Sequence, residues 1–247
     1  MVSDFQLIDE LKHQLDSKRP IPAAVLKNMR DVYLIEWTFN SNAIEGNTLT
    51  LLETKIVIEE GLTIGGKRLK EHFEAINHVE AIKYVEQIVE SKEELYHNTI
   101  KNIHSLVLKN IDGDNAGKYR EINVRISGSK HQPLEHPFVQ EEMDNLLNWY
   151  NKNKDVLHPV ELAALFHFKF VYIHPFSDGN GRTARLLMNF ILMQHGYPPA
   201  IIKADPVKRI QYYEALELAS MKGETNKFVR LVMECVEDNL NEYLRMF

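Results

Sequence analysis

Residues 174–185 read His174-Pro-Phe-Ser-Asp-Gly-Asn-Gly-Arg-Thr-Ala-Arg185, and residues 186–193 continue as Leu-Leu-Met-Asn-Phe-Ile-Leu-Met. The second segment is apolar enough to be a buried central helix. A glycine-bearing loop that opens such a helix presents free backbone N–H groups at the positive end of the helix dipole. The stretch therefore predicts a helical protein with an anion-binding loop, suited to a phosphate chain.

The same loop concentrates side chains for phosphate chemistry. Arg182 and Arg185 are three residues apart, so both guanidinium groups lie on one face of the first helical turn. Asp178 is a candidate ligand for a divalent metal, and His174 titrates near neutral pH. An ordinary helix start would account for one polar residue of this cluster, so we interpret the cluster as a functional site.

This cluster resembles the signature of the Fic family, His-Pro-Phe-x-(Asp/Glu)-Gly-Asn-(Gly/Lys)-Arg-x-x-Arg, at every fixed position. Residues 117–133 (Gly-Lys-Tyr-Arg and then Val-Arg-Ile-Ser-Gly-Ser-Lys-His) look like the family's flap hairpin. The segment 41–47, Ser-Asn-Ala-Ile-Glu-Gly-Asn, resembles its inhibitory motif. The match runs from about residue 35 to residue 235. It implies an all-α fold, a Fic-type helical domain with a short β-hairpin flap and an N-terminal helical extension carrying the inhibitory helix.

The pattern along the chain favours one helical domain with an N-terminal extension. We divide it into an extension (1–95), a Fic catalytic domain (96–235) and the end of a C-terminal helix (236–247). Residues 120–135 alternate like a strand and turn at Gly128. Apolar spacing and capping residues predict helices over residues 23–38, 51–60, 69–91, 98–110, 139–151, 159–172, 181–195, 206–221 and 225–243.

The resemblance implies a protein adenylyltransferase, a nucleotidyltransferase that moves AMP from ATP to a Ser, Thr or Tyr hydroxyl of a target protein. His174 would act as the general base. Asp178 would hold Mg²⁺ across the α- and β-phosphates of the co-substrate ATP. The residues implied to bind ATP and its phosphates are Asp178, Gly179, Asn180, Gly181, Arg182, Thr183, Ala184 and Arg185.

Three further groups of residues receive roles from the same resemblance. A pocket for the nucleotide base is expected from Tyr212, Tyr213 and Ser220. Docking of the target segment, by strand pairing along the flap edge, is expected at Ser127, Gly128, Ser129 and Lys130. The inhibitory residues are Ser41, Glu45, Gly46 and Asn47. A salt bridge between Glu45 and Arg185 would occupy the guanidinium fork meant for the γ-phosphate, so a nearly inactive, self-restrained enzyme is expected.

Several functional alternatives stay open. Gly181 resembles the adenylyl-transferring members of the family, whereas the death-on-curing kinases have lysine at this position. Transfer of another nucleotide, removal of AMP and self-modification are variants of the same chemistry. An alternative of a different class is a non-catalytic, nucleotide-sensing interaction module. The presence of all catalytic positions disfavours that alternative.

Composition narrows the classes of partner. The chain has 247 residues, 44% hydrophobic and 26% charged, as in an ordinary globular protein. A net charge of −6 argues weakly against nucleic acid as the main partner. The single cysteine, Cys235, excludes an intramolecular disulfide. No apolar run approaches the ~18 residues of a membrane span, and the first residues lack a signal-peptide pattern. We expect a cytoplasmic protein without membrane partners, and leave homo-oligomerisation open.

Overall fold

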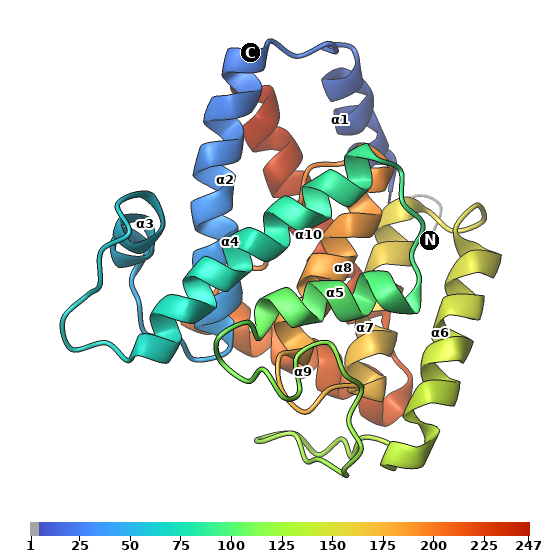
Figure 1. Ribbon diagram of the computed structural model, residues 1–247. Coiled ribbons are helices and arrows are strands. Elements are labelled where there is room, and N and C mark those ends of the chain that lie inside the picture. Colours follow the sequence, from blue (N-terminus) through green and yellow to red (C-terminus); the bar gives the residue numbers. More distant parts are fainter. Residues whose placement is uncertain (1–4) are drawn as a thin grey trace.

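In a computed structural model of the protein, residues 5–247 are described, and they form α-helices, one short 3-10 helix and no strand (Figure 1). The predicted all-α class is confirmed. The helices are α1 (Gln6–Asp16), α2 (Ala23–Ile44), α3 (Leu51–Glu59), α4 (Leu69–Glu90), α5 (His97–Val107), η2 (His136–Phe138), α6 (Val139–Asn153), α7 (Pro159–Ile173), α8 (Asn180–Gln194), α9 (Pro206–Lys222) and α10 (Asn226–Leu244).

Helix α8 is the centre of the fold, as its apolar sequence predicts. All residues from Leu186 to Leu192 are fully buried, and α8 packs against α7, α4 and α5. The helix starts after Gly179, whose φ of +75° lies in the left-handed region that glycine adopts without strain. The central position of α8 fixes its N-terminal turn as a rigid platform for the preceding loop.

Helix α7 delivers the histidine of the signature. Pro159 occupies the first turn, where a missing N–H costs no hydrogen bond. The helix ends at Ile173, and His174 follows in a left-handed conformation with φ of +54°. This conformation is uncommon for a residue with a side chain, so the surrounding contacts must hold it in place.

Helix α2 is longer than the sequence predicts, ending at Ile44 rather than near Thr38. Trp37, Thr38, Ser41 and Ile44 are all buried, so tertiary packing on one face carries the helix through the extra turns. Glu45 is then the first residue beyond the helix. The segment 41–47, predicted to be inhibitory, is therefore the last turn of α2 and the three residues that follow.

Helix α3 projects from one side of the molecule (Figure 1). It begins with a reciprocal capping box between Thr50 and Glu53 and has a small apolar cluster of its own, made of Leu49, Val57 and Ala75. The main core includes side chains from both the proposed extension and the proposed catalytic domain. The boundary between residues 95 and 96 stays a prediction.

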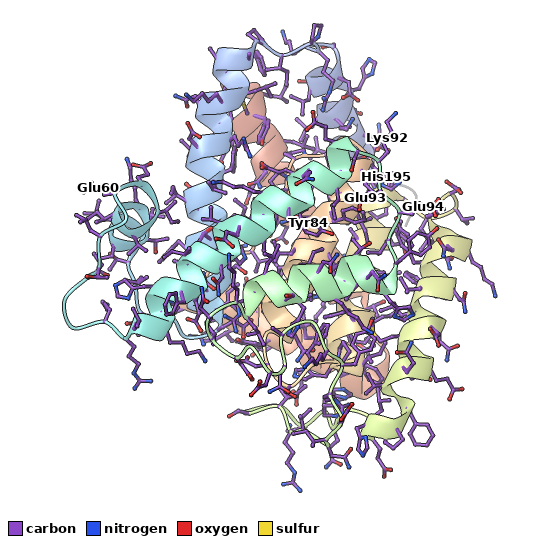
Figure 2. All side chains as sticks on the ribbon, in the orientation of Figure 1. Glu60, Tyr84, Lys92, Glu93, Glu94 and His195 are labelled. Carbon is purple, nitrogen blue, oxygen red and sulfur yellow. The ribbon has the colours of Figure 1, made fainter. Side chains whose placement is uncertain are left out.

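Helix α4 crosses the face shown in Figure 1 from the α3 side to the opposite corner. Lys92, Glu93, Glu94 and His195 gather at that corner in Figure 2 and line a surface groove of about 330 Å³, whereas Glu60 marks the α3 side. Among residues 5–247 no helix is both long and apolar enough to cross a bilayer.

The β-hairpin predicted for residues 120–135 is not formed; the described structure has an irregular loop there, with Gly128 (φ +78°) at its turn. The physical reason is visible at the two ends of the loop. The carbonyls of Ile122 and Leu134 accept hydrogen bonds from the Arg120 side chain rather than from an opposite strand. An isolated two-strand hairpin is marginal by itself, so a side-chain donor can replace its ladder. We call residues 121–135 the flap loop.

Candidate active site

The loop before α8 is held from beneath by His104 of α5. The imidazole stacks on Phe176, with ring centroids 3.5 Å apart and an angle of 1°. The N–H of Gly117 donates to Nδ1 at 2.9 Å, so Nε2 carries the proton that it donates to the carbonyl of Asp178 at 2.9 Å. Burial lowers the pKa of His104 to about 4, so this ring stays neutral. No local sequence pattern marks His104, because its role depends on contacts with residues distant along the chain.

Asn180 closes the same loop with its side chain. Its Oδ1 accepts from the N–H of Phe176 at 2.9 Å, and its Nδ2 donates to the Phe176 carbonyl at 2.8 Å. Thr183 and Ala184 are fully buried and face the core side of α8. Gly179 donates its N–H to the Asp178 carboxylate at 2.6 Å. The predicted anion-binding loop is thus held in one conformation by hydrogen bonds within the loop, two of which come from the Asn180 side chain.

His174 lies at the mouth of this loop, at the end of α7. Burial lowers the pKa of its imidazole to about 4; the backbone of Val171 opposes that shift and the nearby Arg120 charge adds to it. A neutral imidazole at physiological pH can accept a proton. Because Nδ1 is buried, Nε2 is the nitrogen that can reach a substrate.

Asp178 presents a half-exposed carboxylate beside the loop. Burial by itself would raise its pKa, but the positive charges of Arg182 and Lys70 and the Gly179 N–H lower it below the ordinary value. Its Oδ2 lies 3.7 Å from Lys70 Nζ. No cluster of three His, Cys, Asp or Glu side chains suited to a metal occurs within residues 5–247. One ionised carboxylate fits Mg²⁺ held mainly by substrate phosphates and water.

Arg185 is enclosed by groups that fill its guanidinium fork. Nη2 donates to Glu45 Oε1 at 2.7 Å and to the Ser41 carbonyl at 2.8 Å, and Nε donates to Ser41 Oγ at 3.0 Å. Nη1 donates to the Tyr212 hydroxyl at 3.3 Å. Burial would lower the pKa of Arg185, and the Glu45 carboxylate more than offsets this, so the pKa is raised. The contact between Glu45 and Arg185 expected from the sequence is present.

The Glu45 carboxylate also lies over the first turn of α8. A Cβ placed on Gly181 would overlap Glu45 Oε1 and approach Arg185 Nη1 to 3.2 Å. Glu45 is about one-third exposed, whereas the Arg185 side chain is almost fully buried. A carboxylate therefore occupies the helix end that would otherwise receive an anion.

Arg182 has a looser environment on the same turn. Its Nη1 lies 3.4 Å from Glu74 Oε1, and its Nη2 lies 3.5 Å from Asp178 Oδ1. Asn47, the last residue of the segment predicted to be inhibitory, donates to Glu74 Oε2 at 2.9 Å. The first turns of α4, which carry Lys70 and Glu74, lie at the opposite end of that helix from the corner labelled in Figure 2. Neither Lys70 nor Glu74 was predicted as part of the site, because both belong to an amphipathic helix in which the apolar face gives the main sequence signal.

Helix α9 carries all three residues predicted for the base pocket. Tyr212 is buried. Its hydroxyl oxygen lies 3.3 Å from Arg185 Nη1 and 3.1 Å from His167 Nε2. Tyr213 donates to the Ile44 carbonyl at 2.9 Å and lines a groove of about 480 Å³ against the flap loop. Ser220 lines a different groove, of about 630 Å³, between α6, α7 and α9. The ring centroids of Tyr212 and Tyr213 lie 5.4 Å apart, whereas Ser220 lines another groove, so the structure does not bring all three side chains together.

The tip of the flap loop is tied to α9 through one carboxylate. Ser129 Oγ donates to Glu217 Oε2 at 3.0 Å, and the Lys130 N–H lies 3.3 Å from both Glu217 oxygens. Ser127 and Gly128 are exposed at the turn. The proposed docking edge therefore lies in the open, with its far end fixed to the helix that carries Tyr213.

The chain is similar to known proteins over nearly its whole length. A model of the Fic/DOC family matches residues 94–192. A Fic domain containing signaling protein from Bacteroides thetaiotaomicron has a similar structure (TM-score 0.88, 30% identity, 98% of this chain and 97% of that chain). Fic-1 (residues 134–508) from Caenorhabditis elegans has a TM-score of 0.86 at 32% identity, covering 98% and 72%. The "Protein adenylyltransferase Fic" of Nematostella vectensis is 39% identical over 98% of this chain and 56% of its own. The chain spans about half the length of the curated relatives it matches.

Proposed function

Since this chain belongs to the Fic/DOC family, we propose that it transfers AMP from ATP to a hydroxyl group of a target protein, and that Glu45 restrains this transfer. Curated relatives that carry the name protein adenylyltransferase support the activity. The observation that carries the proposal is the filled fork of Arg185, which has Glu45 and Ser41 where a phosphate would bind.

In the proposed reaction, His174 Nε2 accepts the proton of the target hydroxyl. The hydroxyl oxygen forms a bond to the α-phosphorus of ATP, and the bond from that phosphorus to the bridging oxygen of pyrophosphate breaks. The products are a phosphodiester between AMP and the protein, and pyrophosphate. The neutral state of the imidazole, caused chiefly by burial, favours its role as the base.

The phosphate chain would lie against the first turn of α8. Free N–H groups at a helix start bind phosphates, and the two guanidinium groups of Arg182 and Arg185 add forked donors. Asp178 would hold Mg²⁺ there, which when bound neutralises phosphate charge. Gly181 leaves the space above the turn free of any side chain of its own.

The restraint follows from competition for one guanidinium. While Glu45 contacts Arg185 at 2.7 Å, a γ-phosphate cannot take the same donor, so ATP can bind only in a pose unsuited to attack. The carboxylate is one-third exposed and sits just past the end of α2. A shift of that helix end would therefore release the fork.

The test compares ATP labelled at the α-phosphate with ATP labelled at the γ-phosphate, using wild type and Glu45→Gly. Label transferred to protein only from the α position, and much faster in Glu45→Gly, is the expected result. Label from the γ position would indicate a kinase instead. Nucleotide binding without transfer in either protein would leave a nucleotide-sensing module and contradict the proposal.

A further inference from the structure

We infer that Arg120 is a positioning residue, whose single guanidinium sets the backbone of His174 and both ends of the flap loop in one fixed relation. The inference rests on the proposed function for its effect on AMP transfer, while its structural part concerns His174 and the flap loop alone. No role for Arg120 follows from the signature itself, which begins 54 residues later in the chain.

The guanidinium of Arg120 donates in three directions to backbone carbonyls. Nε donates to the carbonyl of His174 at 2.8 Å, Nη1 to Ile122 at 2.9 Å, and Nη2 to Leu134 at 2.6 Å. Its own N–H donates to the carbonyl of Pro175 at 2.9 Å. Arg120 therefore holds the carbonyls of two successive residues, His174 and Pro175, and joins the start of the flap loop to its end.

The charge state of Arg120 argues for a role beyond packing. The side chain is only 3% exposed, and within residues 5–247 no carboxylate lies within ion-pair distance of it. Burial lowers its pKa from the ordinary value. A buried cation held only by carbonyl dipoles is costly, so its place directly behind the base points to a function at that base.

His174 needs such support because of its backbone conformation. With φ at +54° it occupies a region that residues with a Cβ rarely adopt. The Arg120 contacts hold the carbonyl on one side of this strained residue, while the N–H on the other side closes α7 by donating to Phe170 at 3.0 Å. The direction of the imidazole is thereby fixed with respect to the loop along which the target is proposed to dock.

The same guanidinium links the base to target binding. Because one planar guanidinium holds the carbonyls of His174, Ile122 and Leu134, the two ends of the flap loop cannot move apart, or move away from His174, without breaking at least one of these three hydrogen bonds. A lysine at this position would keep the charge but could not direct donors to three carbonyls at fixed angles. The arginine fork, and not the charge alone, is therefore the required feature.

The first measurement follows the titration of the His174 imidazole by NMR and needs no enzymatic activity. The charged groups that influence this ring are Arg120, Glu45 and His131. Arg120→Gln should shift the His174 titration upward toward the ordinary histidine range, because a cation is lost and the site loosens. Arg125→Gln removes an exposed arginine from the same flap loop and should leave the titration unchanged.

The second measurement uses steady-state AMP transfer in the Glu45→Gly background. Arg120→Lys and Arg120→Gln should each lower kcat by at least about tenfold, because a misplaced base reacts poorly. The KM for ATP should stay within about twofold, since Arg182 and Arg185 are untouched. Thermal melting checks that each variant folds. If Arg120→Gln does not fold, the inference is decided by Arg120→Lys, which keeps an aliphatic side chain and the positive charge.

The outcomes separate this inference from the proposed function. If Glu45→Gly transfers no AMP, the proposed function fails, and the His174 titration alone decides the role of Arg120. An unchanged titration in folded Arg120→Gln would overturn the inference. So would a full kcat in Arg120→Lys, because the fork would then be dispensable.

Discussion

Arg182 and Arg185 stand three residues apart on the first turn of α8, both buried, yet their surroundings differ. Arg185 makes hydrogen bonds of 2.7–3.3 Å to Glu45, Ser41 and Tyr212. Arg182 lies 3.4 Å from Glu74 and 3.5 Å from Asp178, and its Nε and Nη1 lack hydrogen-bond partners within the described residues. The Arg185 fork is filled while that of Arg182 is nearly free, so the proposed restraint would act on Arg185 and leave its neighbour largely unaffected.

The largest effect is expected from removing the proposed general base, which should slow AMP transfer and leave ATP binding by the two arginines in place. His174→Ala in the Glu45→Gly background should lower AMP transfer by about 10²- to 10⁴-fold, because a general base is lost. ATP binding, measured by calorimetry, should persist because both forks remain. Transfer within tenfold of the parent protein would remove His174 from the mechanism.

The next effect opens the filled fork. Glu45→Gly should raise self-labelling from ATP by about ten- to hundredfold, as expected for losing a charge-assisted contact of this kind. Adding Arg185→Ala should abolish the gain, since the released fork is then missing. If the double variant labels as fast as Glu45→Gly, Arg185 is not the contested group.

Low pH should lower the stability of the protein through His104, whose Nε2 donates to the carbonyl of Asp178, the residue beside Arg182. Its pKa is lowered to about 4 by burial, so below about pH 6.5 the unfolded chain binds a proton that the folded chain does not. Stability from this group is complete above pH 6.5 and falls by on the order of 1 kcal/mol per pH unit toward pH 4.

Urea unfolding at pH 7 and pH 5 tests this. His104→Gln should show a smaller loss between the two pH values than wild type, whereas the exposed His13→Gln should lose as much as wild type. Equal losses in wild type and His104→Gln would contradict the assignment.

The smallest effect is expected at Arg182, whose guanidinium is nearly free. Glu74→Gln removes the carboxylate 3.4 Å from Arg182, and should strengthen ATP binding only about two- to fivefold, because Arg182 Nη1 makes no hydrogen bond to it and the contact is longer than a charge-assisted hydrogen bond. Glu90→Gln, an exposed change on the same helix, is the matched control. A gain as large as that of Glu45→Gly would show that the two forks are restrained equally.

The sequence predicted the parts of the site that are local in the chain. The loop and first turn of α8 lie within twelve consecutive residues, and their spacing determines which side chains share a face. His104 acts on a carbonyl 74 residues away, and Arg120 on one 54 residues away, so no local pattern reveals them. The flap was misread as a hairpin because its alternation gives no sign of a side chain that would satisfy its carbonyls.

Gly181 carries a consequence for how chains of this kind diverge. Because a Cβ there would overlap the Glu45 carboxylate, any side chain at position 181 requires the far end of Glu45 to move away from its present place. Substitutions at the two positions should therefore be correlated, with a larger residue at 181 accompanied by a different placement, or a different residue, at 45. If Glu45 restrains transfer as proposed, such a chain would need another group to fill the Arg185 fork.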